Sequence, residues 1–399
     1  MPHPTAPVKR EASRDSAPKI IFVRQQFSAF GGAELILDRM LTSLNAGEHK
    51  IALLARSWKG THQGATFIPC NPPKVARFLR ETIFARAACR MLRNYPGALV
   101  QAHERIPCCD IFRAGDGVHA AYLEQRQRGE TAAGKLALAL SLFHRQTLKL
   151  ERAMFASPRL KMVIVNSEMV ANDLARHYDY PRERIRLVPN GIDLERFSLA
   201  ARERHRAETR RSLGIPVEAP VALFVGSGFD RKGLARAIEA CARQNVPLHL
   251  VVIGSDKRPA KFKMHADRAG FGAHFHLVGP VGDPLPYFAA ADVLILPTIY
   301  DPFPSTVIEA LACGLPVVTT TGCGARDVVK RIDPALVCDA FDTEGLSNGL
   351  KRALALAAEP STADSARKIA EEFGLEAMVA RMLKLYDELI PALRGARGA

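Results

Sequence analysis

Short apolar runs rich in β-branched residues recur along this sequence, and most of them are followed by a stretch with helical periodicity. Such runs lie at 19–27, 49–56, 161–167, 184–188, 220–225, 248–253, 275–281, 292–298 and 316–320. Strands that alternate with helices form parallel sheets, because a parallel connection requires a crossover segment. The runs occur in both halves of the chain. The sequence therefore predicts an α/β protein with two doubly wound, Rossmann-like parallel-sheet domains.

The length of the chain favours the same division, since 399 residues exceed what one ordinary core contains. We expect a disordered Pro- and Ser-rich tail at 1–17 that lacks the apolar centre of a signal peptide. The first domain is expected at 18–190 and the second at 191–370. The remaining segment, 371–399, is expected to form a helix that packs back toward the first domain, followed by a tail, since its apolar residues from 375 to 390 recur with a helical period.

The chain is strongly basic, with a net charge of +14 and a pI near 9.6. This balance favours a polyanionic partner, which can be a nucleic acid, an anionic membrane or a phosphorylated substrate. Much of the charge lies in two stretches of the first half, 74–93 and 126–161, which also contain apolar residues. No apolar run approaches the roughly 20 residues needed to span a bilayer.

The cysteines show neither a C-x-x-C pair nor a zinc-finger spacing. They lie at positions 70, 89, 108, 109, 241, 313, 323 and 338. Because no export signal is evident, we expect reduced thiols that pack as small apolar residues, with neither a disulfide nor a metal site. This pattern is typical of a cytoplasmic protein.

The stretch DPFPSTVIEALACGLPVV, residues 301–318, contains two acids around the start of a helix. Asp301 follows an apolar run that reads as a buried strand, and Pro302 and Pro304 mark a turn. Ser305 and Thr306 favour helix entry, and Gly314 and Pro316 end the helix. Ligands bind at the carboxyl ends of strands in open α/β sheets, and helix N-termini offer free N–H groups. Two carboxylates at such a position would accept hydrogen bonds from the hydroxyls of a sugar or ribose.

In each half of the chain, a glycine-containing loop follows the first strand. GSGFDRKG, residues 226–233, combines glycines with Arg231 and Lys232 near a helix start, a composition suited to a diphosphate. FGGAE, residues 30–34, would let backbone N–H groups at Gly31 and Gly32 face a cleft. Either loop alone is equally compatible with an ordinary solvated turn.

Several motifs together resemble the family 4 retaining glycosyltransferases of the GT-B fold. They are the D-x7-E spacing at 301–309 with ALACGLPVV after it, VPNGID at 188–193 and the 226–233 loop. FGG at 30–32, AGD at 114–116 and GSDKRPAKF at 254–262 are similar to the lipopolysaccharide core glucosyltransferase I type within that family. The resemblance covers roughly residues 18–390.

The resemblance implies a role for each of these residues toward a nucleotide diphosphate sugar, of the UDP-linked kind, with no separate cofactor. Glu309 would bind the ribose and Asp301 the donor hexose, while Arg231 and Lys232 would neutralise the leaving diphosphate in place of a metal ion. Asp116 would stabilise either the acceptor hydroxyl or the developing oxocarbenium charge. The implied donor-binding residues are Gly31, Gly32, Gly226, Asp301, Ser305, Thr306 and Glu309.

The chain departs from the family pattern at two donor positions. The first acid of the motif is usually Glu, and Asp301 is one methylene shorter. Pro304 replaces the usual Gly and cannot donate a backbone N–H. Both changes fall on the contact with the hexose, so they bear on the identity of the sugar rather than on the nucleotide. His103 and His119 flank the Asp116 region and can be either structural or catalytic.

The function expected from these patterns is transfer of a hexose to a lipid-linked saccharide, such as the lipopolysaccharide core. The partners are then the nucleotide sugar, the acceptor and an anionic membrane, with the protein peripheral on the cytoplasmic face of the inner membrane. A nucleotide-sugar epimerase or hydrolase is an alternative, but it gives no reason for the basic first half. A nucleic-acid-binding protein is a third possibility. The sequence argues against it, because basic and aromatic residues are not interleaved.

Overall fold

The computed structural model describes residues 19–28, 50–59, 65–73 and 75–395. The expected N-terminal tail and the glycines Gly31 and Gly32 lie outside these ranges. The chain forms two compact units. One comprises Met1–Arg113, Lys149–Met162 and Leu383–Ala399, and the other comprises Ala114–Leu148 and Val163–Met382.

A seven-stranded sheet forms from the first half of the chain, in the order β5-β3-β1-β6-β7-β8-β9. Its strands are β1 (Ile20–Val23), β3 (Ile51–Ala55), β5 (Ala65–Pro69), β6 (Leu99–Ala102), β7 (Ile111–Arg113), β8 (Met162–Val165) and β9 (Ile185–Leu187). β1 pairs in parallel with both β3 and β6, so that Ile20 lies opposite Ile51 on one side and Leu99 on the other. The strand order proceeds outward from β1 in both directions, so the topological switch point lies between β1 and β6.

A six-stranded sheet forms from the second half, in the order β12-β11-β10-β13-β14-β15. Its strands are β10 (Val221–Val225), β11 (His249–Ile253), β12 (Phe275–Gly279), β13 (Val293–Ile295), β14 (Val317–Thr320) and β15 (Val337–Cys338). β10 pairs in parallel with β11 and with β13. The switch point of this sheet therefore lies between β10 and β13. The prediction of two doubly wound parallel sheets is confirmed.

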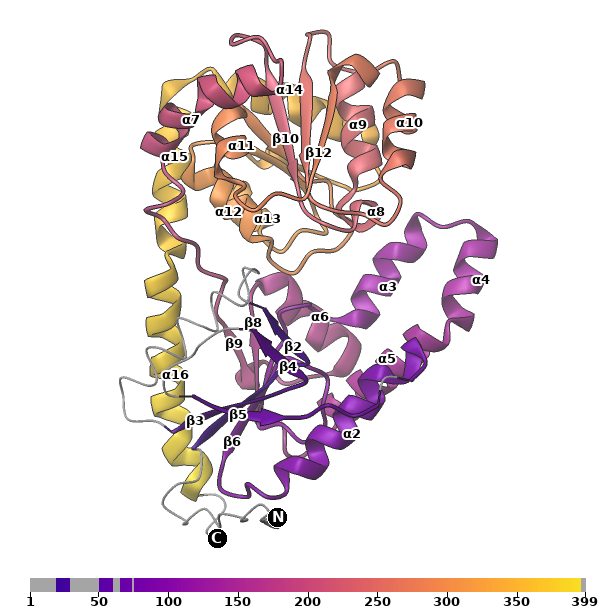
Figure 1. The fold of residues 1–399 in the computed structure, drawn as a ribbon, viewed down its shortest axis with the longest axis vertical. Helices are drawn as coiled ribbons and strands as arrows, with labels where there is room; N and C mark the ends of the chain where they lie inside the picture. The colour runs from indigo at the N-terminus through magenta and orange to yellow at the C-terminus, as the bar shows by residue number, and fades with distance from the viewer. Residues whose placement is uncertain (1–18, 29–49, 60–64, 74, 396–399) are drawn as a thin grey trace, which may run out of the picture. The chain divides into compact units, whose positions relative to one another are not determined.

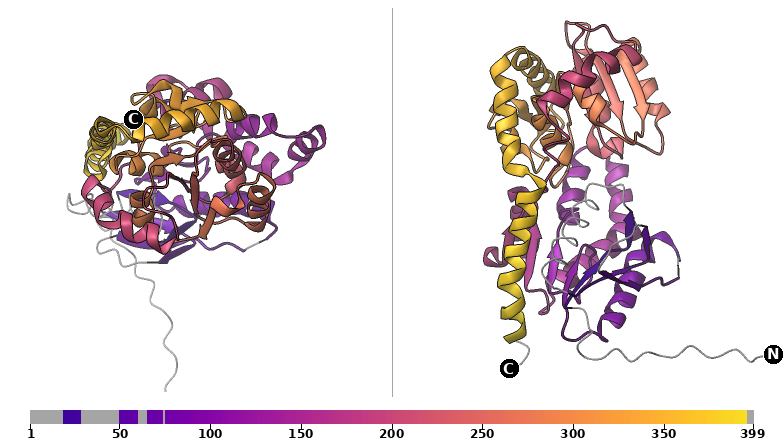
Figure 2. Two further views of the ribbon diagram at one scale, coloured as in Figure 1. Left: turned by 90° about the horizontal axis from the view of Figure 1, so that it is seen from above. Right: turned by 60° about the vertical axis from the view of Figure 1, so that its left-hand side comes forward.

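Helices cover both faces of the second sheet (Figures 1 and 2). α9 (Leu234–Ala242) packs against α10 (Ala260–Arg268) and α14 (Thr343–Ala357). α11 (Leu285–Ala290) packs on α7 (Leu199–Ser212), and α12 (Ser305–Ala312) packs on α15 (Pro360–Ala370). The shorter helices are α8 (Phe229–Lys232) and α13 (Arg326–Val329). All strand residues of β10, β11, β13 and β14 are buried, as expected of a sheet covered on both sides.

Within the described residues of the first half, the helices are α2 (Arg80–Leu92), α3 (His119–Arg128), α4 (Ala132–Leu140), α5 (Leu142–Phe155) and α6 (Glu168–Tyr178). The final helix, α16 (Leu375–Gly395), buries Met378, Met382 and Tyr386 on one face, as its periodicity predicts. The Tyr386 hydroxyl donates to Gln101 Oε1 at 2.7 Å, and its ring packs edge-to-face on Phe22.

Three expectations about the first half need revision. Residues 19–27 do not form one strand, because β1 ends at Val23 and a separate strand, β2 (Gln26–Ser28), pairs with β4 (Ser57–Lys59). The helix expected from 75 begins as a 3-10 turn at Arg77–Leu79 before α2. The strands β5, β6 and β7 were not anticipated, since each is short and gives no strong alternation.

The expectation that all cysteines are reduced thiols is wrong for Cys89 and Cys108, which form a disulfide. They are 19 residues apart, and the fold brings α2 next to the segment after β6, which no sequence spacing signals. The other cysteines are free, and Cys70, Cys109, Cys241, Cys313 and Cys323 are buried as predicted. Burial raises the pKa of the Cys241 thiol, which keeps it protonated and unreactive.

Among the residues that the structure describes, no helix is both long and apolar enough to cross a membrane.

Candidate active site

The candidate site lies where β10 and β13 end, at the switch point of the second sheet. The loop 226–233 follows β10, and the segment 296–304 follows β13. The carboxyl ends of these two neighbouring strands form the crevice in which open α/β sheets bind ligands. The topology therefore brings together Lys232 and Asp301, which sequence reasoning selected separately.

The Asp301 carboxylate binds both cations of the glycine-containing loop. Asp301 Oδ2 accepts from Lys232 Nζ, and it lies 3.3 Å from Arg231 Nη1. Arg231 Nη1 also donates to the carbonyl of Tyr300 at 3.0 Å. Asp301 and Lys232 are buried, whereas 38% of the Arg231 side chain is exposed. The acid predicted to hold the sugar and the cations predicted to hold the diphosphate thus form a single cluster, in which the ion pairs are poorly screened by water.

Glycine allows this loop to approach the segment after β13. Gly233 has φ of 86°, and a Cβ atom there would lie 2.0 Å from the Pro297 carbonyl oxygen. Gly226, with φ of 147°, lies against the aliphatic part of Lys232. The amide of Phe229 donates to Asp256 Oδ2 at 2.9 Å, so the 254–262 motif supports the same loop. Both motif stretches therefore contribute to placing Lys232.

Glu309 lies on α12, half-buried, and its carboxylate makes no hydrogen bond or ion pair within the described ranges. Burial raises the pKa of Glu309 to about 7, against the opposing effect of Arg196 and Lys232. A carboxyl group that lacks partners and titrates near neutrality is typical of a binding or catalytic site. It is suited to hydrogen bonding with ligand hydroxyls.

The helix α12 begins at Ser305, as predicted, with Pro304 at the N-cap position and no side-chain cap. The role expected of Ser305 and Thr306 as donor-binding residues stays a prediction. The Thr306 hydroxyl is buried and has no hydrogen-bond partner among the residues described. Such a hydroxyl costs free energy unless a ligand or water satisfies it.

Asp116 is exposed and lies in the loop between β7 and α3. This loop packs directly against the segment that contains Asp301. A Cβ atom on Gly117 would lie 2.5 Å from Tyr300 Oη and 2.8 Å from Pro302 Cγ. The structure therefore places Gly117, the residue after Asp116, against the two residues that flank Asp301. Sequence reasoning missed Tyr300, whose position directly before Asp301 was the available signal.

The two histidines near this region differ in their surroundings. Burial lowers the pKa of His103 well below its usual range, and Arg24 and Arg113 lower it further, so this imidazole stays neutral. His119 begins α3 and contacts His144, with 3.1 Å between Nε2 and Nδ1. Neither observation gives a catalytic role to these residues.

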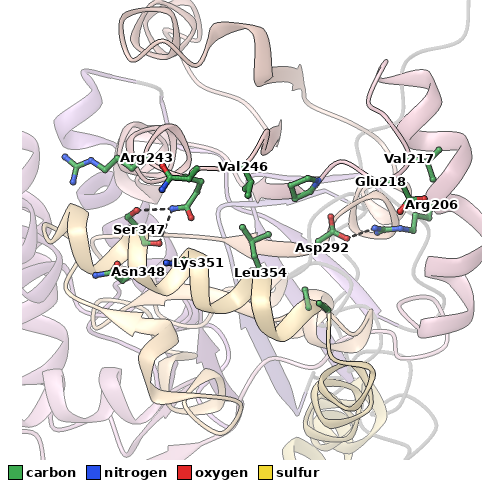
Figure 3. Close-up of a pocket in the computed structure, with 15 residues that line it drawn as sticks. Arg206, Val217, Glu218, Arg243, Val246, Asp292, Ser347, Asn348, Lys351 and Leu354 are labelled. Atoms are coloured by element: carbon green, nitrogen blue, oxygen red, sulfur yellow. Dashed lines mark hydrogen bonds and ion pairs between the residues drawn. The ribbon is translucent and has the colours of Figure 1, made fainter.

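A cavity of about 680 Å³ lies elsewhere (Figure 3). Pro220 and Asp292, which line it, directly precede β10 and β13, so it occupies the amino ends of the strands. Two pairs of its polar lining side chains bond each other: Gln244 bonds Ser347, and Arg206 pairs with Asp292. None of the predicted site residues lines it, and we exclude it as the active site.

No group of three or more His, Cys, Asp or Glu side chains suited to a metal ion occurs in the described parts of the chain.

Comparison with known proteins supports the likeness seen in the motifs. The family model Glycosyltransferase Family 4 matches residues 30–196, and Glycosyl transferases group 1 matches residues 205–378. The chain is 28% identical to the lipopolysaccharide glucosyltransferase WaaG of Escherichia coli (strain K12), over 84% of this chain and 89% of that protein. A D-inositol 3-phosphate glycosyltransferase of Salinispora arenicola (strain CNS-205) is 32% identical, but the match covers 58% of this chain and 55% of that one.

Solved structures give the same picture. The crystal structure of WaaG matches with a TM-score of 0.76 and 26% identity, over 92% of this chain and 99% of that chain. Anabaena HepE in complex with UDP-glucose matches in fold, with a TM-score of 0.67 at 17% identity over 93% of this chain and 100% of that chain. Two family models, one for each half, match the chain, and the WaaG structure matches 92% of it in fold. The chain therefore belongs to the glycosyltransferases of the GT-B fold.

Proposed function

We propose that the protein is a retaining glycosyltransferase that moves a hexose from a UDP-type nucleotide sugar to a lipid-linked saccharide such as the lipopolysaccharide core. The observation that carries this proposal is the cluster of Asp301, Arg231 and Lys232 at the switch point, with Glu309 beside it. Both the sugar and the diphosphate of a donor have a matching chemical group there. The similarity to WaaG, a lipopolysaccharide glucosyltransferase by name, supports the acceptor class.

The two cations act on the leaving diphosphate. Negative charge grows on the bridging phosphate oxygen as the glycosidic bond breaks, and preorganised cations stabilise that charge without a divalent metal. Arg231 is partly exposed and can reach a ligand, whereas Lys232 is buried against Asp301. A diphosphate that draws Lys232 toward itself leaves Asp301 free to accept hydrogen bonds from the hexose hydroxyls.

Glu309 binds the ribose hydroxyls in this proposal. Hydroxyls that donate to a carboxylate favour its charged form, so donor binding lowers the pKa that burial has raised. The ribose hydroxyls thus supply the hydrogen bonds that the Glu309 carboxylate lacks in the free protein. The Thr306 hydroxyl, buried without a described partner, is available to the same ligand.

Asp116 acts at the acceptor side of the reaction centre. An exposed carboxylate beside the donor sugar can accept a hydrogen bond from the acceptor hydroxyl, or stabilise positive charge on the sugar ring. Retention of the anomeric configuration forms part of the proposal because the 301–309 motif resembles that of retaining enzymes.

The surface of the first half fits an anionic lipid. Leu136, Leu140 and Leu142, on and just after α4, are 60%, 63% and 52% exposed, and Lys135 and Arg145 lie near them. On α2 the apolar side chains, such as Phe84 and Leu92, are buried in the protein itself, and exposed arginines occupy the outer side. We infer that α4 contacts the membrane with apolar side chains and α2 through charge alone, on the cytoplasmic face of the inner membrane.

A glycosyltransferase that acts on a free phosphorylated polyol is the second candidate. The match to D-inositol 3-phosphate glycosyltransferases favours it, and a basic chain suits a phosphorylated acceptor. The exposed leucines of α4 have no role in that reading, which makes the lipid-linked acceptor the better supported of the two.

A panel of nucleotide sugars tests the donor first. A ligand at 100 times its Kd stabilises the folded state by about 2.7 kcal/mol, which a thermal shift detects. The stabilising donor is then assayed with lipopolysaccharide core precursors and with inositol phosphate, with and without EDTA, and the anomer formed is identified by NMR. We expect UDP-hexose binding and chelator-resistant transfer to the lipid with retention. Stabilisation by no nucleotide sugar, or an inverted product, would refute the proposal.

Vesicle sedimentation tests the membrane contact. We expect binding to anionic vesicles at low salt, release at high salt, and no binding to neutral vesicles, because each engaged Lys or Arg contributes about 1 kcal/mol. Charge reversal at Arg77, Arg80 and Arg90 should weaken binding and leave donor affinity unchanged. Replacing Leu136 and Leu140 by Ser should weaken the part of the binding that salt does not remove. Wild-type protein that stays in the supernatant at low salt contradicts this inference.

A further inference from the structure

Tyr300 forms two side-chain hydrogen bonds in the interior of the protein. Its ring is 4% exposed, and its hydroxyl accepts from the backbone N–H of Val118 at 2.9 Å. The same hydroxyl donates to Asp173 Oδ2, on α6, at 3.0 Å. Its partners are 182 and 127 residues away in the sequence. All three residues belong to one compact unit of the chain.

The bond to Val118 holds one end of the turn that carries Asp116. The other end is held by the sheet, where the amide of Ala114 donates to Ile164 O at 2.9 Å. Between them, the Gly117 amide donates to Ala114 O at 3.1 Å, which closes the turn. Gly117 has φ of 70°, and the Tyr300 ring fills the space that a Cβ atom would need. The exposed carboxylate of Asp116 therefore extends from a turn that is anchored on both sides.

Asp173 sets the direction of the Tyr300 hydroxyl. Its Oδ1 accepts from Arg176 Nη2 at 3.3 Å, while its Oδ2 faces Tyr300. A phenol has one proton to donate, and this proton is used on the carboxylate. The oxygen lone pairs then remain directed toward the Val118 N–H, and the two bonds of these buried side chains reinforce each other.

The backbone of Tyr300 serves the donor side of the site at the same time. Its carbonyl oxygen accepts from Arg231 Nη1 at 3.0 Å, and the next residue, Asp301, binds both Arg231 and Lys232. One residue thus contacts the cation proposed for the diphosphate through its main chain and the Asp116 turn through its side chain.

We propose that Tyr300, oriented by Asp173, is a positioning residue that sets the distance between Asp116 and the Asp301 cluster. This inference rests on the proposed function, because it assigns the two acids to one reaction centre. Misplacement of a catalytic group by about 1 Å costs roughly 100-fold in rate, whereas the donor contacts proposed for Arg231, Asp301 and Glu309 do not involve the Tyr300 hydroxyl. Loss of the hydroxyl should therefore affect turnover and spare donor affinity.

The matched control is Tyr122, on α3. Its ring packs edge-to-face on Tyr300, with 6.4 Å between centroids, and its hydroxyl accepts from Arg126 at 3.3 Å instead of from the turn. Tyr122→Phe removes one hydroxyl from the same aromatic cluster without changing the Val118 contact.

The experiment compares Tyr300→Phe, Asp173→Asn and Tyr122→Phe with the wild type. We expect Tyr300→Phe to lower kcat by roughly 10- to 100-fold with UDP-glucose affinity within about twofold of the wild type. Asp173→Asn should lower kcat in the same direction, and the double variant should lose less than the product of the two single effects. Tyr122→Phe should resemble the wild type.

Hydrogen exchange of the 114–118 turn gives a readout that does not depend on activity. Exchange at the Val118 amide should be faster in Tyr300→Phe than in the wild type or in Tyr122→Phe, because only that variant loses the acceptor. Unchanged exchange there, an unchanged kcat, or parallel losses of kcat, donor affinity and stability would overturn the inference. If the wild type transfers no sugar while Val118 exchanges faster in Tyr300→Phe as expected, the proposed function is refuted and the positioning of the turn is not.

Discussion

Asp292 and Asp301 lie at opposite ends of strand β13, and both bind cationic side chains. Asp292, at the amino end, accepts from Arg206 and from Arg210 Nη2, the latter at 2.8 Å, and lies 3.8 Å from Arg202. Arg210 is fully buried and also donates to the carbonyls of Ala290 and Ala219, each at 2.8 Å. The Asp292 cluster therefore directs Arg206 and Arg210 at other parts of the protein, and among its atoms Arg202 Nε is buried without a hydrogen-bond partner in the described residues.

The Asp301 cluster is incomplete by comparison. Arg231 is partly exposed, Glu309 is a carboxyl group without a described partner, and the Thr306 hydroxyl is buried and unsatisfied. Charge pairs that are saturated by protein groups stabilise a fold, whereas unsatisfied groups are a cost that a ligand can offset. The difference indicates that one end of the strand serves structure and the other serves binding.

The largest expected effect is on stability, at Asp292. Asp292→Asn should destabilise the protein by about 3–5 kcal/mol, because it leaves the buried Arg210 guanidinium without its counter-charge. Chemical denaturation measures this change, with Glu203→Gln, an exposed carboxylate on α7, as control. Donor affinity should be unchanged under conditions where the variant is folded. A small stability change accompanied by weaker donor binding would reverse the roles assigned to the two ends.

The cations of the Asp301 cluster should show the opposite pattern. Arg231→Ala and Lys232→Ala should each reduce kcat about 100-fold, or about 2.7 kcal/mol, since they stabilise charge that develops in the transition state. Steady-state kinetics with and without EDTA measure this effect, and the wild type should be indifferent to the chelator. Loss of wild-type activity in EDTA that Mg²⁺ restores would contradict the role given to these residues.

Substitution of Glu309 should have opposite effects on donor affinity and on the stability of the free protein. Glu309→Gln should weaken UDP-sugar binding by roughly 1.5–3 kcal/mol, through loss of a charge-assisted hydrogen-bonding site. The same substitution should stabilise the free protein at pH 8. Because the pKa of Glu309 is raised to about 7 in the folded state, its stabilising contribution is present below the unfolded value of 4.5 and is lost as the pH rises through about 7.

Denaturation at several pH values and calorimetry with UDP-glucose measure the two effects of Glu309→Gln. If the variant binds the donor as the wild type does, or is less stable than the wild type at pH 8, Glu309 is not an unpartnered carboxylate that binds the donor.

The smallest effect concerns acid sensitivity at the amino ends of the strands. Burial, His276 and His274 lower the pKa of His249 to about 4, and His249 is the first residue of β11. Its stabilising contribution is therefore complete above 6.5 and is lost as the pH falls toward about 4. Between pH 7 and pH 5 we expect His249 to account for up to about 2 kcal/mol of lost stability. In the neutral variant His249→Gln, the free energy of unfolding should fall less between pH 7 and pH 5 than in the wild type. An equal fall in both proteins would show that other groups cause the acid sensitivity.

The sequence by itself determined the two doubly wound sheets and half of the site. Strand and helix periods repeat locally, and Pro and Gly punctuate them, so five strands of the second sheet and the start of α12 could be read without a structure. The spacing of Asp301 and Glu309 and the Arg231–Lys232 pair are also local patterns. For these residues, the chemistry follows from the position of each at a strand end or a helix start.

Only the tertiary structure decided which distant residues meet. Nothing near Tyr300 in the sequence points to Asp173 or Val118, and the Asp292 cluster joins a helix to a strand that begins about 80 residues later. The Cys89–Cys108 disulfide, against expectation, arises in the same way. Local propensity extends over a few residues, whereas these contacts depend on how the crossovers stack helices on sheets. The contacts that position the candidate site were therefore fixed by packing, and the local pattern does not show them.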